Sequence, residues 1–250
     1  MKSRIVTAYA LLLSSLGATM AGAVEITVLS TQATEPAYRE LVPQFENATG
    51  HTVKTTFTGT LDAKKRIAVG EPFDLLIMSS PDIDAFSTLG TLVRGSRIDL
   101  AKSGVGVGVK AGAPKPDIST TEAFKQTLLA AKSIGYSTGP SGVYVMDLFA
   151  RLGVTDQVKP KLKQTPTGVF VGSIVASGEV EIGIQQVSEM SHFAGVDYVG
   201  PLPAEIQKMT IFSSGIAAKG QQPDAAKALV KFLTAPNAAE AFKKRGMEPG

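Results

Sequence analysis

The chain has 250 residues, of which 44% are hydrophobic and 19% are charged, and its formal net charge is +3. This length can form one large core or two small ones. The weak positive charge excludes the strongly basic surface that nucleic-acid binding requires. The chain has no cysteine, which excludes disulfides, thiol catalysis and iron–sulfur clusters, and its two histidines are too few for a multi-histidine metal site. We therefore expect neither a metal nor a cofactor.

Residues 1–23 have the pattern of a secretory signal peptide. Lys2 and Arg4 form a basic start, residues 5–16 are apolar, and Ala21-Gly22-Ala23 matches a signal-peptidase site. The alternative, a membrane anchor, fits less well because the apolar stretch is short. We expect cleavage after Ala23 and a periplasmic protein. Cleavage would remove Lys2 and Arg4, which lowers the number of basic side chains from 25 to 23 against 22 acidic ones. The cleaved chain is nearly neutral, so any attraction for an anion must come from groups at the binding site.

The remaining chain alternates short β-branched segments with helical patterns, which is typical of an α/β fold. In the first part we expect strands at residues 25–29, 52–57, 74–78 and 105–110, and helices at residues 35–47 and 62–69. The strand at 105–110 is rich in glycine, which is unusual inside a sheet.

The second part continues this alternation. Ser119-Thr-Thr-Glu122 is a capping box that predicts the start of a helix ending near residue 129. Further helices are predicted at residues 141–152, 171–177, 223–233 and 237–244, and strands at 133–137, 181–185, 197–199 and 210–218.

Two extended segments that contain glycine bracket the middle of the chain. We expect residues 24–103 and 210–250 to form lobe 1 and residues 110–205 to form lobe 2. The chain would then cross between the lobes twice, with hinges at about residues 104–109 and 206–217, because glycine permits backbone rotation at low cost. The alternative is one continuous sheet with two irregular strands.

Four predicted strands end in loops rich in hydroxyl and amide groups. In open α/β sheets, ligands lie beyond the carboxyl ends of the strands, where helix N-termini present free N–H groups. Uncharged donors suit a dehydrated anion, although the same residues also fill ordinary turns and N-caps. The candidate ligand-binding residues in these loops are Ser30, Thr31, Thr58, Thr60, Ser137, Ser141, Gly142, Gln185 and Gln186.

Several short motifs follow one another in a specific order. They include Gly70-x-Pro72-x-Asp74, Ser141-Gly142-Val143-Tyr144, Gly183-Ile184 and Ala235-Pro236. In their order and spacing the chain resembles the periplasmic molybdate-binding proteins, which are substrate-binding components of ABC transporters. The resemblance implies a type II periplasmic-binding-protein fold with two hinge crossovers, and a monomer that captures a small anion between its lobes for an inner-membrane permease.

The resemblance also bears on individual residues. It implies a ligand contact from the Thr60 hydroxyl, one from the amide at Ser141, and a further backbone contact near Gly168. Two positions depart from the family pattern. Ala33 stands where the family has a serine, and Gln186 stands where it has a tyrosine, which suggests a ligand of another shape, such as a carboxylate.

The molybdate-binding-like proteins also resemble periplasmic aconitate isomerases, and this is the alternative function. Such an enzyme needs an acid and a base within reach of the substrate. The candidates are Glu189, Lys64 and His192, with Glu35 as a further carboxylate. Lys64 lies in a basic run that would also suit a solvated helix face, and a lone histidine is commonly exposed. From the sequence alone we favour a binding protein over an isomerase.

Overall fold

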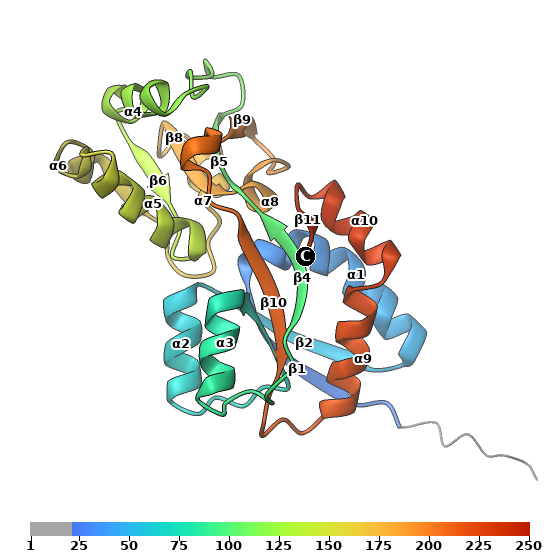
Figure 1. The fold of residues 1–250 in the computed structure, drawn as a ribbon. Coiled ribbons are helices and arrows are strands. Elements are labelled where there is room, and N and C mark those ends of the chain that lie inside the picture. The colour runs from blue at the N-terminus through green and yellow to red at the C-terminus, as the bar shows by residue number, and fades with distance from the viewer. Residues whose placement is uncertain (1–21) are drawn as a thin grey trace, which may run out of the picture.

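Two β-sheets, joined by two chain crossings, divide the molecule into two lobes (Figure 1). The computed structural model describes residues 22–250. The predicted signal peptide therefore falls outside the described residues, apart from Gly22 and Ala23, which are exposed and lie outside any helix or strand. Within residues 22–250, no helix combines the length and the hydropathy of a membrane span.

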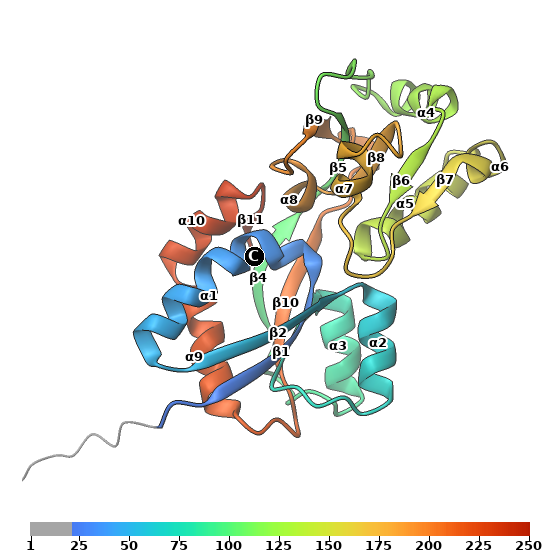
Figure 2. The same ribbon diagram turned by 180° about the vertical axis from the view of Figure 1, so that it is seen from behind.

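Lobe 1 is built on a six-stranded sheet with the order β11-β4-β10-β3-β1-β2, in which β1, β2 and β3 run parallel. Helices cover both faces of this sheet (Figures 1 and 2). The strands are β1 (Glu25–Thr31), β2 (Thr52–Thr58), β3 (Leu75–Ser79), β4 (Ile98–Ser103), β10 (Thr210–Ile216) and β11 (Glu248–Pro249). On one face lie α1 (Glu35–Thr49), α9 (Pro223–Leu233) and α10 (Pro236–Lys244), and on the other α2 (Thr60–Ala68) and α3 (Ser80–Thr88).

Strand β3 shows why the sheet is covered on both sides. Leu75 and Ile77 pack in the core beneath α1, α9 and α10, whereas Leu76 and Met78 pack beneath α2 and α3. Successive side chains of a strand point to opposite faces, so a continuously apolar strand must be buried on both.

Lobe 2 is built on a five-stranded sheet with the order β7-β6-β8-β5-β9, in which β6, β7 and β8 run parallel. Its strands are β5 (Val105–Lys110), β6 (Ile134–Tyr136), β7 (Leu162–Gln164), β8 (Ile182–Gln186) and β9 (Val196–Pro201). Its helices are α4 (Thr121–Ala130), α5 (Pro140–Arg151), α6 (Thr155–Val158), α7 (Val171–Ala176) and α8 (Val187–Met190). Three short 3-10 turns are also present within residues 22–250. They are η1 (Gln32–Thr34) after β1, η2 (Lys159–Lys161) after α6, and η3 (Ala204–Ile206) after β9.

The glycines expected to act as hinges lie inside paired strands. A Cβ atom on Gly108 would lie 2.6 Å from the Met190 sulfur, and one on Gly106 would lie 2.7 Å from the Tyr198 ring. Gly215 lies in β10 and pairs with β3. These glycines permit close packing, and rotation there would break the ladders of hydrogen bonds. The chain passes between the sheets at Gly104 and over residues 202–209, so the connections are shorter than the predicted hinges at 104–109 and 206–217.

Helix α4 is capped by Thr120 and not by Ser119, the first residue of the predicted capping box. The hydroxyl of Thr120 accepts a hydrogen bond from the Ala123 amide at 3.1 Å, one residue later than predicted. The helix itself occupies the predicted segment.

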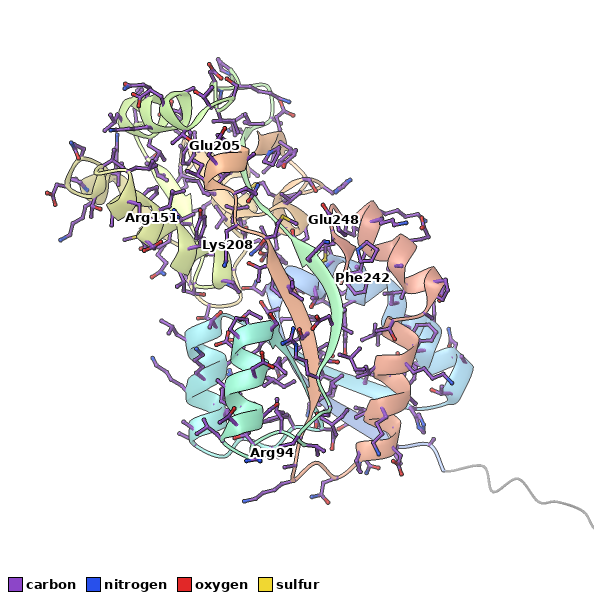
Figure 3. The ribbon with its side chains drawn as sticks, viewed as in Figure 1. Arg94, Arg151, Glu205, Lys208, Phe242 and Glu248 are labelled. Carbon is purple, nitrogen blue, oxygen red and sulfur yellow. The ribbon has the colours of Figure 1, made fainter. Side chains whose placement is uncertain are left out.

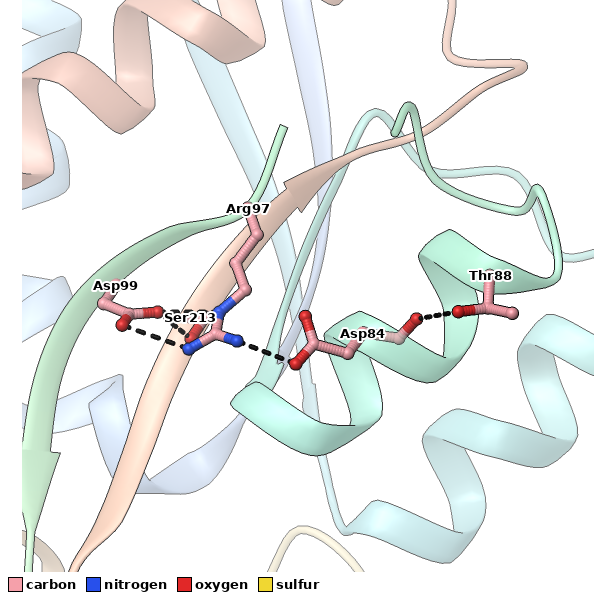
Figure 4. Close-up of polar contacts among 5 residues, drawn as sticks. All are labelled: Asp84, Thr88, Arg97, Asp99 and Ser213. Carbon is pink, nitrogen blue, oxygen red and sulfur yellow. Dashed lines mark hydrogen bonds and ion pairs between the residues drawn. The ribbon is translucent and has the colours of Figure 1, made fainter. Parts of the chain in front are cut away.

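A partly exposed polar network fixes α3 to the sheet of lobe 1 (Figure 4). Arg97 donates to Asp99 at 2.9 Å and to Asp84 of α3 at 2.7 Å. Asp99 also accepts a hydrogen bond from Ser213 of β10 at 2.6 Å. The hydrogen bond from Arg97 lowers the pKa of Asp99 below its usual value, so the network keeps its charges near neutral pH.

Candidate functional site

The parallel strands of both lobes end at the boundary between the lobes. In lobe 1, β1, β2 and β3 lead into η1, α2 and α3, and in lobe 2, β6, β7 and β8 lead into α5, α7 and α8. The two sets of loops meet, because a Cβ atom on Gly59 would overlap the side chain of Thr138. Helix N-termini from both lobes therefore converge between the lobes, and their free N–H groups favour an anion there.

Most of the predicted ligand hydroxyls are satisfied within their own loops. The Ser30 and Thr34 hydroxyls lie 3.1 Å apart, and those of Ser137 and Ser141 lie 3.2 Å apart. Thr58 donates to Asp62 at 2.6 Å. Thr31 is buried in the first loop, and no hydrogen bond of its side chain is found among the described residues. These hydrogen bonds give Ser30, Thr58, Ser137 and Ser141 a role in holding the loops.

Among the buried polar atoms of lobe 1 that have no protein partner, two lie at the boundary with lobe 2. The Thr60 hydroxyl at the first position of α2 is unpaired, with the residue 8% exposed. The Gln32 amide nitrogen, in the first loop, is also unpaired, with the residue 6% exposed. Buried polar groups normally have a partner, so unpaired ones at helix starts mark a place for a ligand or water. Thr60 was a sequence candidate, whereas Gln32 was missed although it directly follows β1.

In lobe 2 the hydroxyl of Thr165, in the loop that precedes α7, is also unpaired. Thr165 was also missed, because nothing in its local sequence separates it from an ordinary turn residue. Gly168 lies in the same loop, exposed, with a φ of +82° that favours glycine. Gly142 lies against the Ser137 backbone so closely that a Cβ atom would overlap it, so this glycine allows α5 to begin there.

Gln186 has a structural role that replaces the expected ligand contact. In the amide orientation that satisfies its neighbours, its nitrogen donates to the carbonyls of Gly104 at 2.8 Å and Ser103 at 3.0 Å. Its oxygen accepts from the Thr210 hydroxyl at 3.2 Å. The amide thus joins both chain crossings, and its hydrogen-bonding capacity is used within the protein.

Gln185 is likewise occupied. Its oxygen accepts a hydrogen bond from the Val171 amide at 2.8 Å, and its nitrogen donates to the Glu189 carboxylate at 2.8 Å. Gln185 therefore positions Glu189 and the start of α7.

Glu189 is a buried carboxyl group at the contact between the lobes. The residue is 6% exposed, and burial raises the pKa of its carboxyl group to about 8, with the negative charge of Glu35 adding to the shift. Glu35 belongs to lobe 1, where it pairs with Arg39 at 2.6 Å. Next to Glu189, the Ser188 hydroxyl donates to the Ala33 carbonyl of lobe 1 at 2.8 Å. Glu189 can therefore gain or lose a proton near neutral pH at the lobe boundary.

The other two candidate acid–base residues make no contact with Glu189. The Lys64 ammonium pairs with Asp82 at 2.6 Å, and the exposed His192 ring lies 2.9 Å from the Ser191 hydroxyl. Of the three candidates, Glu189 alone is a buried titratable group.

A cavity of about 590 Å³ opens between α2 and α3 of lobe 1 and α5 of lobe 2. Its lining includes Thr60 and residues 208–211, which lead into β10. Figure 3 labels Lys208 beside this end of β10, where the two lobes meet. Thr60 therefore lines an open space that reaches both lobes, and its unpaired hydroxyl is buried just beneath that surface.

Known proteins of two kinds are similar to this chain. An aconitate isomerase from a Pseudomonas species is 38% identical over 230 residues, which are 90% of this chain and 87% of that protein. The molybdate-binding protein ModA of Azotobacter vinelandii is 29% identical, and the alignment covers 98% of this chain and 96% of that protein. The solved structure of the periplasmic molybdate-binding protein of Azotobacter vinelandii superposes with a TM-score of 0.76 at 18% identity, over 90% of this chain and 99% of that one.

These similarities confirm the predicted α/β, type II periplasmic-binding-protein fold and the resemblance to the molybdate-binding-protein-like group. Residues 26–248, almost the whole described chain, match the family described as bacterial extracellular solute-binding protein. The chain is a member of the bacterial extracellular solute-binding protein family.

Proposed function

We propose that this protein binds a small polycarboxylate between its lobes and interconverts cis- and trans-aconitate by proton transfer. The observation that carries the proposal is Glu189, a carboxyl group buried at the lobe boundary with a pKa raised to about 8. An acid–base catalyst works best when its pKa is near the working pH. The 38% identity to an aconitate isomerase supports this chemistry, and reverses the preference that the sequence alone suggested.

The reaction needs one proton-transfer group and no redox partner. The Glu189 carboxylate takes a proton from the methylene carbon of cis-aconitate, and the electron pair of that C–H bond moves into the allylic system. The proton on the Glu189 carboxyl group exchanges with solvent before Glu189 protonates the former vinyl carbon, and the double bond shifts by one position to give the trans isomer. No other bond forms or breaks, so the reaction is balanced without a cofactor.

The substrate carboxylates have donors to meet them. Helix N-termini converge between the lobes, and the buried Thr60 hydroxyl and Gln32 amide nitrogen there have no protein partner. Neutral donors of this kind stabilise carboxylates without burying a second formal charge. Binding would also supply Thr60 and Gln32 with the partners they lack.

A single variant tests the catalytic role. Glu189→Gln keeps the size of the side chain and removes its acid–base function, so isomerisation should fall by about 10²–10⁴-fold. The measurement is proton NMR of cis-aconitate with the purified protein, and in deuterated water the trans product should carry deuterium at one carbon. Glu205→Gln, in the 3-10 turn η3, is the matched control. Unchanged turnover by Glu189→Gln would assign the proton transfer to another group.

Capture of a small anion for an ABC permease is the second candidate function. The observation in its favour is the 29% identity to a molybdate-binding protein over 98% of this chain. A monomer that binds molybdate in calorimetry and converts no aconitate would establish this function in place of the isomerase.

Export to the periplasm belongs to both proposals, because the family is one of extracellular solute-binding proteins. Cleavage after Ala23 would leave Val24, just before β1, as the first residue. Intact mass of the protein isolated from the periplasm tests this, and a mass that includes residues 1–23 would contradict it.

A further inference from the structure

The groove between α2, α3 and α5 is large enough to hold an organic ligand. Its volume is about 590 Å³. Cavities of about 300–1,000 Å³ hold small organic ligands. A five-atom oxyanion would leave most of this space to water, whereas a branched carboxylic acid extends across it.

Thr60 links the groove to the anion-binding helix N-termini. It lies at the first position of α2, it lines the groove, and its buried hydroxyl has no partner. A buried donor without a partner, in a residue that lines a cavity, is a candidate partner for a ligand group in that cavity. One carboxylate of a ligand is therefore expected at Thr60, with the rest of the molecule in the groove.

The charges of the groove leave one cation uncompensated. Lys64 pairs with Asp82 at 2.6 Å, and Asp147 pairs with Arg151 at 3.0 Å. Lys208 also lines the groove, and within residues 22–250 its ammonium group makes no ion pair or hydrogen bond. Lys208 is therefore the positive charge available to an anionic group in the groove.

The mouth of the groove is apolar on both sides. Leu61 of lobe 1 and Val143 of lobe 2 line it and are 59% and 57% exposed. Met209, next to Lys208, lines it as well and is 40% exposed. Large apolar side chains left exposed at one opening suit the carbon skeleton between two carboxylates. Tyr144 fixes this wall by donating from its hydroxyl to the Ile206 carbonyl at 2.6 Å.

We propose that Lys208 binds the outlying carboxylate of a di- or tricarboxylate whose other carboxylate lies at Thr60. Lys208 then selects polycarboxylates over tetrahedral oxyanions, because only an extended ligand reaches both positions. The inference rests on the proposed function in one respect, namely that a polycarboxylate occupies the space between the lobes. It concerns binding and does not depend on turnover.

Calorimetry with tricarballylate, a saturated tricarboxylate that has no double bond to move, tests the inference apart from catalysis. Lys208→Met should weaken tricarballylate binding by about tenfold, the range for losing a charged hydrogen bond. Lys208→Arg keeps the charge and should bind within about threefold of the wild type. Lys231→Met, an exposed lysine of α9, is the control and should bind as the wild type does.

The outcomes separate this inference from the isomerase proposal. Equal tricarballylate affinity in Lys208→Met and Lys231→Met overturns the role of Lys208, even if the protein isomerises aconitate. Tenfold weaker binding in Lys208→Met supports it, even if no aconitate is converted and the isomerase proposal fails. A wild type that binds no tricarballylate overturns both.

In an active protein, Lys208→Met should raise KM for aconitate by about tenfold and leave kcat nearly unchanged.

Discussion

The two sides of the lobe boundary differ in how they are built. On the side of α8, the lobes are in direct contact, since Ser188 donates to the Ala33 carbonyl at 2.8 Å and a Cβ atom on Gly246 would lie 2.9 Å from Val187. On the side of α5, a cavity of about 590 Å³ separates the lobes. The closed side contains Glu189, and the open side contains Thr60 and Lys208. The comparison teaches that the proposed proton-transfer group lies where the lobes are packed together, so a substrate bound at Thr60 and Lys208 must extend from the open groove toward Glu189.

The closed side depends on Gln186, and removing its side chain should have the largest effect. Gln186→Ala leaves two carbonyl groups and one hydroxyl at the crossings without their partner. Unsatisfied buried groups cost about 1–3 kcal/mol each, so the free energy of unfolding should fall by about 3 kcal/mol. Urea denaturation measures this, with the exposed Gln221→Ala as control. Surface substitutions usually change the free energy of unfolding by about 0.5 kcal/mol. If Gln186→Ala differs from the control by no more than that, other contacts hold the crossings.

The pH dependence of activity tests the assignment of Glu189 as the base. The pKa of its carboxyl group is raised to about 8, so the reactive carboxylate is a minor form at pH 6. The value of kcat/KM should rise by roughly fifty-fold from pH 6 to pH 8 and level off above that. A profile that falls over this interval would show that the protonated form of the enzyme starts the reaction.

The contact between Gly59 and Thr138 tests whether the open side must close on the ligand. Gly59→Ala places a methyl group against the Thr138 side chain, so the lobes must separate at this point. Such overpacking costs about 1–3 kcal/mol, and ligand affinity should fall by about tenfold. Thr138→Gly in the same chain removes the overlap and should restore affinity. If the double variant binds no better than Gly59→Ala, the contact does not limit closure.

A further prediction concerns stability and pH on the closed side. Because the folded pKa of Glu189 is raised above its usual value, the folded state retains a proton that the unfolded chain releases as the pH rises from about 4.5 to about 8. Its contribution to stability is therefore lost over that interval. Glu189→Gln, which does not ionise, should gain roughly 3 kcal/mol relative to the wild type between pH 5 and pH 8. Thermal unfolding at both pH values measures the gain, and an equal difference at both would contradict the raised pKa.

Periodicity predicted most of the fold because it reports which faces are buried. The strand expected at 105–110 and the helix expected at 223–233 have the observed bounds of β5 and α9. Helix α3 and strand β4 were not predicted. Only Ile83 and Phe86 of the short helix α3 are buried, which leaves little helical periodicity, and β4 is paired with β10 and β11, which are distant in sequence.

The site was less predictable, because its residues are assigned by contacts between distant segments. The hydroxyl-rich loops were located correctly at strand ends, yet most of these hydroxyls bond within their own loops. The roles of Gln185 and Gln186 follow from partners in α7, α8 and the crossings, which no local pattern reveals. Glu189 was named as a candidate, but its raised pKa depends on burial by the other lobe.

The way the crossings are joined has a consequence for the thermodynamics of binding. Gln207 on the second crossing accepts from the Val105 amide at 2.7 Å and donates to its carbonyl at 2.9 Å, and Gln186 joins Gly104 to Thr210. Two strands connected in this way bend as one ribbon, so the lobes lose few independent orientations when a ligand binds. Less conformational entropy is then lost on closure, and more of the contact energy remains as affinity.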